Sequence, residues 1–281
     1  MSARVFAVDL GATWLRTALV SPADEAIEAR SAVPTPETAA EACALLDAAW
    51  RCAGAPRTVA LATAPELAPG GVVRRWPNRR SYEGHRLLSD ALAACAPALF
   101  DDATAAAISG HPRGDQRSST VCVTVGTGVG GGAVVAGVPL LGRSGAAMDV
   151  GHMPVPAAAG LSCRCGRVGC VQAAASGRAL RRYLAGAETD IFRQHDSDAA
   201  AAIARAAVAL AETLAIIDRL FNSTRVIVAG GLGLSRLYGR IEGALKDRQI
   251  AIPLARHPAG EDAGLLGAAI GFDLRRRGSG S

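Results

Sequence analysis

Apolar residues first gather in a short run at residues 4–10 (Arg-Val-Phe-Ala-Val-Asp-Leu), which predicts a buried strand that ends at an acidic residue and a glycine. Residues 15–20 predict its hairpin partner. The rest of the first half predicts alanine-rich helices at about 36–54 and 86–96, apolar runs at 58–63 and 97–100, and a helix over 103–110.

A second block repeats the opening pattern. It predicts a strand at 120–125, a glycine-dense turn at 126–132 and a strand at 133–136. Further on, it predicts a long helix over 198–222, a strand at 225–229, a glycine turn at 230–233 leading into a helix, and a last helix at about 262–276.

Strand, glycine turn and strand thus occur twice, which predicts a duplicated α/β unit. We expect an N-terminal domain over 1–115 and a C-terminal domain over 116–281, with the boundary in the polar stretch 111–119. The last helix, 262–276, is able to pack back on the first domain.

Composition and charge narrow the ligand class. The chain has 281 residues, long enough for two domains, and a formal net charge of +5. Nearly all of its basic residues are arginine, since Lys246 is the only lysine. This balance suits an anionic ligand such as a nucleotide. The chain has no block of basic residues interleaved with aromatics, so we expect no nucleic-acid partner.

The chain shows no sign of export or of membrane insertion. Met1 runs almost directly into a strand, and no apolar run approaches the roughly 20 residues that span a bilayer. We therefore expect a cytoplasmic protein with no membrane partner. Its seven cysteines are then reduced, which favours metal binding over disulfides for any clustered group.

Asp9-Leu-Gly-Ala-Thr13 lies between two predicted strands. Gly11 lets the backbone approach a phosphate, Thr13 offers a hydroxyl, and Asp9 is suited to hold Mg²⁺ directly or through water. An ordinary hairpin explains such a motif equally well when it stands alone.

Two later glycine clusters extend this prediction. Val125–Gly132 contains Gly126, Thr127, Gly128 and Gly130, and such glycine density frees several N–H groups for phosphate oxygens. Gly230 and Gly231, between a strand and a helix, either admit an adenosine against flat backbone or form a tight turn. Together the three turns predict a bound nucleotide.

Asp101 and Asp102 stand at the start of a predicted helix. A helix N-terminus stabilises a carboxylate, so one aspartate is explained as a cap. The second is then a candidate general base, because phosphoryl transfer needs a carboxylate that accepts the proton of the attacking hydroxyl.

A candidate metal site follows in the second half. Cys163, Cys165 and Cys170 lie within eight residues, with His152 shortly before them. This set fits a tetrahedral zinc site, and four protein ligands indicate structural rather than catalytic zinc.

In this order, the motifs resemble those of the ROK family of bacterial sugar kinases and repressors. Asp9–Thr13 and the 125–132 run resemble its two phosphate motifs, and Asp149-Val-Gly-His152 with the cysteine run resembles its signature segment. Gly264-Leu-Leu-Gly-Ala-Ala resembles its C-terminal helix.

The resemblance implies an α/β actin-like ATPase fold, with two RNase H-like domains and the sugar and Mg-ATP between them. It implies that Asp102 accepts the proton of the sugar's primary hydroxyl. It further implies that His152 binds zinc through one ring nitrogen and faces the sugar with the other. A homodimer is the expected assembly.

The sugar-binding positions depart from the family pattern. Asp101 and Thr104 replace asparagines, and Asp149 and Gln172 replace glutamates. The tryptophan expected in the segment after Asn78 is absent, with Tyr82 its stand-in. By this resemblance the residues expected to bind the sugar are Asn78, Asp101, Asp102, Asp149, His152 and Gln172. These changes argue against plain glucose.

Asp101 suggests the alternative to glucose. An ionised carboxylate only accepts hydrogen bonds, so an ammonium group would suit it. We therefore expect an amino sugar such as kanosamine, phosphorylated at O6, with glucose or a glucose-like cyclitol as alternatives. A sugar-binding regulator is the alternative of a different class. Family repressors carry an N-terminal winged-helix domain, and here the first predicted strand begins by Arg4.

Overall fold

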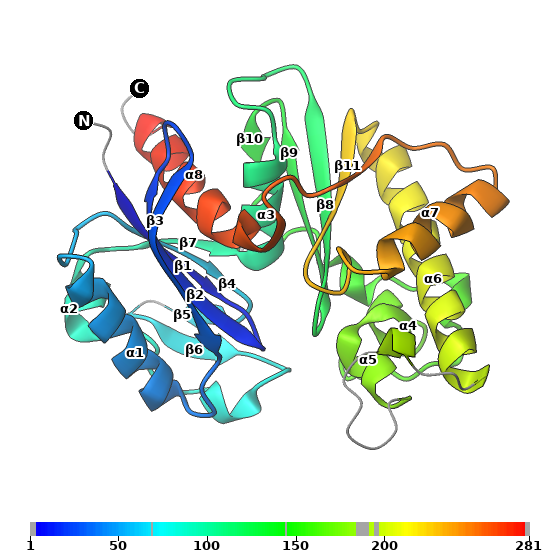
Figure 1. Ribbon diagram of the computed structural model, residues 1–281, viewed down its shortest axis with the longest axis horizontal. Helices are drawn as coiled ribbons and strands as arrows, with labels where there is room; N and C mark the ends of the chain where they lie inside the picture. The colour runs from blue at the N-terminus through cyan, green and yellow to red at the C-terminus, as the bar shows by residue number, and fades with distance from the viewer. Residues whose placement is uncertain (1–3, 69, 144, 184–190, 194–196, 279–281) are drawn as a thin grey trace. The chain divides into compact units, whose positions relative to one another are not determined.

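Two five-stranded sheets with the same strand order organise the chain in the computed structural model, which describes residues 4–68, 70–143, 145–183, 191–193 and 197–278 (Figure 1). In each sheet three neighbouring strands are antiparallel and the remaining two continue in parallel. The predicted duplication of an α/β unit is therefore confirmed.

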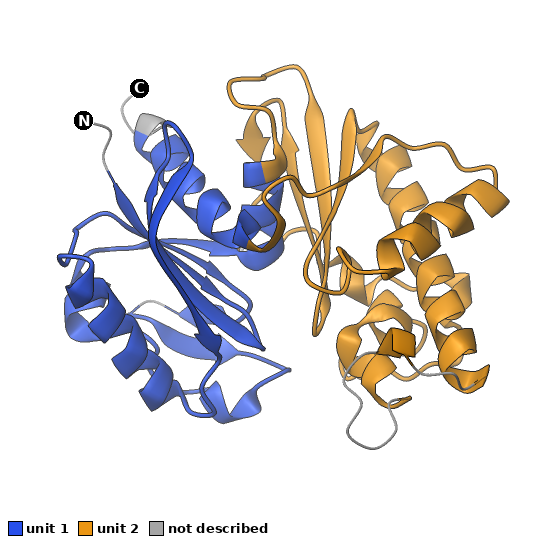
Figure 2. Cartoon of the chain, viewed as in Figure 1, with its two compact units in different colours: residues 1–109, 262–281 blue, residues 110–261 orange. Residues whose placement is uncertain are grey.

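Each sheet belongs to one of two compact units (Figure 2). Unit 1 comprises residues 1–109 and 262–281, and unit 2 comprises residues 110–261. The boundary precedes the expected one at residue 115, because the polar stretch after the helix folds with unit 2. There the two ring nitrogens of His111 contact Thr120 Oγ1 at 3.0 Å and the Asp115 carbonyl oxygen at 2.8 Å.

Unit 1 is built on the sheet β3-β2-β1-β4-β7. Its elements are β1 (Val5–Leu10), β2 (Trp14–Ser21), β3 (Ala26–Pro34), α1 (Ala39–Cys52), β4 (Val59–Thr63), β5 (Glu66–Ala68), β6 (Val72–Arg75), the 3₁₀ turn η1 (Arg80–Tyr82), α2 (Asp90–Ala94), β7 (Ala98–Asp101), α3 (Asp102–Gly110) and α8 (Ala263–Gly278).

Helices cover both faces of this sheet, which explains why its central strands are continuous apolar runs. Phe6 and Val8 of β1 pack with α1, whereas Asp9 on the opposite face of the strand lies against α8 (Figure 1). A capping box fixes the start of α1, because Thr38 Oγ1 accepts from Glu41 N at 3.2 Å and Glu41 Oε2 accepts from Thr38 N at 3.3 Å.

One face of α8 consists of glycines, which lets the helix approach the other elements of unit 1 closely. A Cβ at Gly264 would lie 2.7 Å from Asp9 Cγ, and one at Gly271 would lie 2.5 Å from the Phe100 ring. A Cβ at Gly267 would lie only 1.8 Å from the carbonyl oxygen of Ala105 in α3. The three glycines recur at helical spacing, so together they form one contact face.

Unit 2 is built on the sheet β10-β9-β8-β11-β12. Its elements are β8 (Ser119–Val125), β9 (Val129–Val135), β10 (Val138–Pro139), η2 (Val150–His152), η3 (Pro156–Ala158), α4 (Val171–Ala175), α5 (Gly177–Arg181), η4 (Ile191–Arg193), α6 (Ser197–Phe221), β11 (Arg225–Ala229), α7 (Leu237–Asp247), β12 (Leu254–Arg256) and η5 (Gly260–Asp262), which leads back into unit 1.

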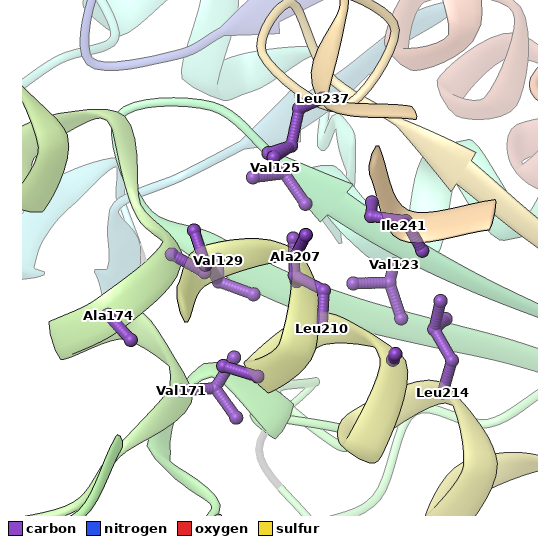
Figure 3. Close-up of a cluster of buried hydrophobic side chains, with 14 of the residues drawn as sticks. Val123, Val125, Val129, Val171, Ala174, Ala207, Leu210, Leu214, Leu237 and Ile241 are labelled. Carbon is purple, nitrogen blue, oxygen red and sulfur yellow. The ribbon is translucent and has the colours of Figure 1, made fainter. Parts of the chain in front are cut away.

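The core of unit 2 lies between its sheet and α6. Leu210 and Leu214 of α6 point toward Val123 of β8, with α4 and α7 adding side chains at the two ends of the cluster (Figure 3). Alanines fill most of the remaining buried face of α6, so the helix lies close to its neighbours.

The expectation that no segment is long and apolar enough to span a bilayer is wrong for α6, which reaches that length and composition. However, 56% of its most apolar 18-residue window is buried within the fold. A core helix that packs on a sheet has the same composition as a membrane span, and burial in unit 2 accounts for it.

Two predicted elements differ from the observed ones. The glycine run 126–132 was expected to be a turn, but only residues 126–128 connect the strands and β9 already starts at Val129. The helix expected over 86–96 is restricted to Asp90–Ala94, because Ser89 Oγ accepts from Leu92 N and starts it late.

The glycine face of α8 generates a stability prediction. Gly267→Ala should lower the free energy of unfolding by about 3 kcal/mol or more, since a methyl group cannot fit against the carbonyl oxygen of Ala105 without moving a helix. Gly239→Ala in α7 is the matched control, because a Cβ there meets nothing within 4 Å. This control should gain about 0.5–1 kcal/mol. Urea denaturation of both variants would measure the two changes in the free energy of unfolding. Equal changes in the two variants would contradict the packing argument.

Candidate active site

Two adjacent aspartates at the junction of β7 and α3 take different roles in unit 1. Asp101 ends the strand, and its Oδ1 accepts from the backbone N–H groups of Ala103 at 3.0 Å and Thr104 at 3.3 Å. Asp101 is therefore the N-terminal cap of α3. Asp102, the first helical residue, has its pKa raised by burial, which the backbone N–H of Ala103 partly offsets. A carboxylate in such surroundings is a better proton acceptor than one in water.

Asp9 lies at the same edge of the sheet, because β1, β4 and β7 are parallel and their carboxyl ends meet there. Its carboxylate is 13% exposed and stands 3.5 Å from the guanidinium of Arg16. Burial raises the pKa of Asp9 to about 7. Arg16 opposes this shift, and the charges of Asp102 and Asp262 add to it. The region is therefore short of positive charge, and a cation beside Asp9 would restore its ionised form.

The loop after Asp9 is a tight connection between β1 and β2. Gly11 N donates to the Trp14 carbonyl oxygen at 2.9 Å. Thr35 holds the loop from outside, since its Oγ1 donates to the Gly11 carbonyl at 2.7 Å and its N–H to the Thr13 carbonyl at 2.9 Å. Arg79, which the sequence analysis did not single out, donates to the carbonyl oxygen of Ala12 at 2.7 Å.

Asn78 is placed in a turn that closes where Arg79 N donates to the Trp76 carbonyl at 2.8 Å. The expectation that Tyr82 replaces the missing tryptophan at the sugar is wrong. Tyr82 is completely buried, with its ring 4.7 Å from Trp76 and its hydroxyl donating to the Pro36 carbonyl. Its side chain belongs to the core of unit 1. Thr104, the second departure in this unit, is likewise fully buried within α3.

The glycine loop of unit 2 is a three-residue hairpin. Gly126 N donates to the Gly128 carbonyl at 2.9 Å, whereas Gly130 lies within β9 opposite Thr124. The start of α5 is joined to this loop, as Gly177 N donates to the Gly126 carbonyl at 2.7 Å. In the same way, Arg178 N donates to the carbonyl of Thr127 at 3.3 Å.

The structure brings the two glycine turns of unit 2 together at Val125, the last residue of β8. Leu232 N and Gly233 N both donate to its carbonyl oxygen, at 3.1 and 2.9 Å. Gly230 has φ +81°, and a Cβ there would lie 2.5 Å from the same oxygen, so only glycine fits. Gly231, in contrast, has open space where a Cβ would lie, with no atom within 4 Å.

His152, Cys163, Cys165 and Cys170 place one nitrogen and three sulfur atoms within 4.8 Å of one another. Cys165 Sγ lies 3.7 Å from Cys170 Sγ, and Cys163 Sγ lies 3.5 Å from His152 Nδ1. Tetrahedral zinc, with bonds of about 2.3 Å to sulfur and 2.0–2.1 Å to nitrogen, separates its ligands by about 3.8 and 3.6 Å. These two separations match zinc, and no pair of ligand atoms in the cluster is more than 4.8 Å apart, so small side-chain movements would complete the site.

The thiols of this cluster have different environments. The backbone N–H and the side chain of Arg167 lower the pKa of Cys165 to about 6. Burial, reinforced by the neighbouring thiols, raises the pKa of Cys170 to about 12. The cluster thus stabilises a thiolate at Cys165 by itself, whereas ionisation of Cys170 needs a cation.

The remaining predicted residues flank the cluster. Asp149 is exposed and precedes η2, where its carbonyl accepts from His152 N at 3.1 Å. Gln172 of α4 accepts from Val129 N through Oε1 at 3.0 Å, which ties it to the first residue of β9. Gln172 is therefore a support for the hairpin that carries the glycine loop.

Within each unit, predicted site residues thus lie close together. Unit 1 places Asp9 and Asp102 at one sheet edge beside the loop of Gly11, and unit 2 joins its glycine turns and holds the metal cluster. Thr35 and Arg79 are not among the predicted residues. Both act on backbone carbonyl oxygens of the loop, for which a sequence carries no signal.

Comparisons with known proteins identify the family of the chain. The sequence model of the ROK family matches residues 5–273. An N-acetylmannosamine kinase of Escherichia fergusonii is 36% identical over 94% of this chain and 96% of its own. A kanosamine kinase of Amycolatopsis mediterranei is 34% identical over 67% of both chains. A ROK family glucokinase from Streptomyces griseus, solved with glucose and AMPPNP, is 27% identical, with a TM-score of 0.77 over 98% of this chain and 100% of its own. The predicted actin-like ATPase fold is confirmed.

Asp9 generates a pH prediction. Its folded pKa of about 7 lies above the ordinary 3.8, so the folded protein binds a proton that the unfolded chain releases. Its charge therefore lowers stability as pH rises from about 4 to about 7. Asp9→Asn removes this penalty and should raise the free energy of unfolding by about 2 kcal/mol at about pH 8, with a smaller gain at about pH 5.

Urea denaturation of both proteins across this range would test the trend. Asp24→Asn is the control without a trend, because a hydrogen bond from Ser21 lowers the pKa of Asp24 below 3.8. Asp24 is then ionised in the folded and the unfolded chain across this range, so the effect of its substitution should not change with pH. A pH-independent effect of Asp9→Asn would contradict the raised pKa.

Proposed function

Because the chain belongs to the ROK family and is an ATP-dependent sugar kinase of that family, we propose that it phosphorylates the primary hydroxyl of an amino hexose with Asp102 as the general base. The supporting observation is the pair Asp101–Asp102. Asp101 already caps α3, and Asp102 has a pKa raised by burial. Asp102 is therefore suited to take up a proton.

In this proposal a carboxylate oxygen of Asp102 accepts the hydrogen bond of the sugar's primary hydroxyl and then its proton. The hydroxyl oxygen forms a bond to the γ-phosphorus as the bond to the leaving diphosphate oxygen breaks. Partial burial of Asp102 raises its proton affinity while the helix N-terminus keeps its charged form accessible.

Asp9 is the residue that would hold Mg²⁺, which neutralises charge on the phosphoryl oxygens when bound. Its surroundings fit a cation, since burial and the charges of Asp102 and Asp262 raise the pKa of Asp9, whereas Arg16 lowers it. Gly11 and Thr13 would offer backbone and hydroxyl donors to the phosphates.

The glycine turns of unit 2 would serve the nucleotide. Gly126, Thr127 and Gly128 form the hairpin, Gly130 follows in the strand, and Gly230 and Gly231 flank the adenosine side. The fixed hydrogen bonds to Val125 would keep these turns in one arrangement before ATP binds, which reduces the ordering cost of binding.

Kanosamine is the substrate that the charge of Asp101 supports best. Asp and Asn cap helices equally well, so the cap alone does not select a carboxylate. An ammonium group on the sugar would explain it through a charge-assisted hydrogen bond. N-acetylmannosamine is the second candidate, favoured by the 36% identity to an N-acetylmannosamine kinase over almost the whole chain.

The metal cluster would bind structural zinc. Its four ligands leave no open coordination position, so zinc would stabilise the segment from η2 to α4 and take no part in the reaction. Reduced thiols and ATP are both found in the cytoplasm, which is the expected location.

The kinase prediction is tested with a sugar panel. Protein with Mg-ATP should phosphorylate kanosamine or N-acetylmannosamine better than glucose, as measured by mass spectrometry of the sugar phosphates. Asp102→Asn should lower kcat by about 10²–10⁴-fold with sugar binding retained, because an amide cannot accept the proton. Full activity of this variant would exclude Asp102 as the base.

Asp101→Asn is the matched variant for the substrate, since it keeps the helix cap and removes the charge. Its kcat/KM should fall for kanosamine and stay unchanged for N-acetylmannosamine, which is neutral. Equal effects on the two sugars would contradict the role of the charge.

The zinc prediction has a separate readout. Elemental analysis should find about one zinc per chain. Cys170→Ser should lose the metal and lower Tm by about 5 °C or more, because a loss of 1 kcal/mol shifts Tm by roughly 2–4 °C at this size. Cys52→Ser is the control, an exposed thiol outside the cluster. Zinc retained at full stoichiometry in Cys170→Ser would overturn the ligand assignment.

A further inference from the structure

We propose that Arg79 is a positioning residue that couples the turn carrying Asn78 to the phosphate loop Gly11–Thr13, so that sugar and nucleotide strengthen each other's binding. This rests on the proposed function in one respect, namely that Asn78 faces the sugar and the loop faces phosphate. The hydrogen bonds of Arg79 carry the inference.

The guanidinium of Arg79 is bound by three backbone carbonyl oxygens on two separate loops. Nε donates to Ala12 at 2.7 Å, Nη1 to Pro36 at 2.6 Å and Nη2 to Thr35 at 3.0 Å. An ion pair with Glu37 at 3.6 Å adds little, because the side chain of Glu37 is 91% exposed. We refer to Arg79 with its three carbonyl acceptors as the Arg79 clamp.

Because Arg79 is mostly buried, its hydrogen-bond donors need acceptors within the protein. The side chain of Arg79 is only 16% exposed, and a buried guanidinium is costly unless its donors are satisfied. All three acceptors must therefore stay in place together. A rigid, planar group with several fixed donors transmits a displacement of one loop to the other better than flexible contacts would.

The clamp also sets the direction of the loop amides. Peptide groups are planar and trans, so a carbonyl that points toward a donor directs the next N–H to the opposite side. Arg79 holds the Ala12 carbonyl and Thr35 Oγ1 holds the Gly11 carbonyl. The N–H group of Thr13 consequently points away from Arg79, and that of Ala12 points away from Thr35 Oγ1, so these two side chains fix the orientation of both amides.

On the other side, the turn that carries Asn78 is stiff. Trp76 N donates to Glu83 Oε1 at 2.7 Å, Arg79 N donates to the Trp76 carbonyl at 2.8 Å, and the Trp76 ring is 1% exposed. Tyr82 adds a second link, since its hydroxyl donates to the same Pro36 carbonyl that Arg79 contacts. A shift of Asn78 on sugar binding would therefore move Arg79 and, through it, Ala12.

Calorimetric binding of Mg-AMPPNP tests the coupling, with and without saturating kanosamine, and in parallel with N-acetylmannosamine. In the unmodified protein one of these sugars should tighten nucleotide binding by about 10-fold. Arg79→Met keeps the length of the side chain and removes its donors. In this variant the sugar effect, which is the ratio of the nucleotide affinities with and without sugar, should fall close to one. Its kcat/KM should be lower by about 10²-fold.

Arg79→Lys keeps the charge with a single nitrogen, which cannot span three carbonyls, so an intermediate coupling is expected. Arg79→Lys also allows the coupling to be measured if Arg79→Met does not fold. Arg80→Met, a change at the neighbouring exposed arginine, is the matched control and should keep the full sugar effect.

A merely structural role would lower Tm in Arg79→Met and leave the sugar effect on nucleotide affinity intact, and that result would overturn the proposal. Unmodified protein in which neither sugar changes nucleotide affinity would overturn it as well. Failure of the proposed function is seen separately, as the absence of sugar phosphate from unmodified protein in the panel.

Discussion

Close packing of α8 on the other elements of unit 1 is the constraint on which the acidic site depends. Gly264, Gly267 and Gly271 leave no side chain between the helix and its neighbours, so the first turn of α8 lies directly against the carboxylate of Asp9. The same contact face fixes α3, which starts at Asp102. The helix thereby excludes water from Asp9 and helps to raise the pKa of its carboxyl group.

Unit 2 uses glycine in the same way. A Cβ at Gly151 would lie 2.1 Å from the Val129 carbonyl, and one at Gly131 would lie 2.7 Å from the Met148 carbonyl. These contacts hold the segment of His152 against β9. Glycine in the 126–132 run therefore has two functions, since Gly126 and Gly128 form the hairpin whereas Gly131 permits close packing. The density of glycine in a sequence therefore does not show which of these two functions a given glycine has.

The sequence predicted the two-fold repeat, the acidic pair and the metal ligands because each has a local pattern. It missed β3, whose side chains are mostly exposed and follow no strict alternation, and the short β12. The assignment of Tyr82 to the sugar failed because an aromatic residue gives no sign of whether it faces a ligand or the core. Arg79 was invisible for a different reason. Its partners are backbone carbonyl oxygens on loops that lie 43 to 67 residues away in sequence.

Asp101 shows how a local role and a functional one can be separated. Its helix cap would be served equally by the asparagine of the ROK pattern, so capping does not explain the carboxylate. The helix N-terminus stabilises a carboxylate at this position with or without a ligand, so the charge distinguishes sugars only if a cation approaches it. A protonated amino group on the sugar would be such a cation, through a charge-assisted hydrogen bond to Asp101.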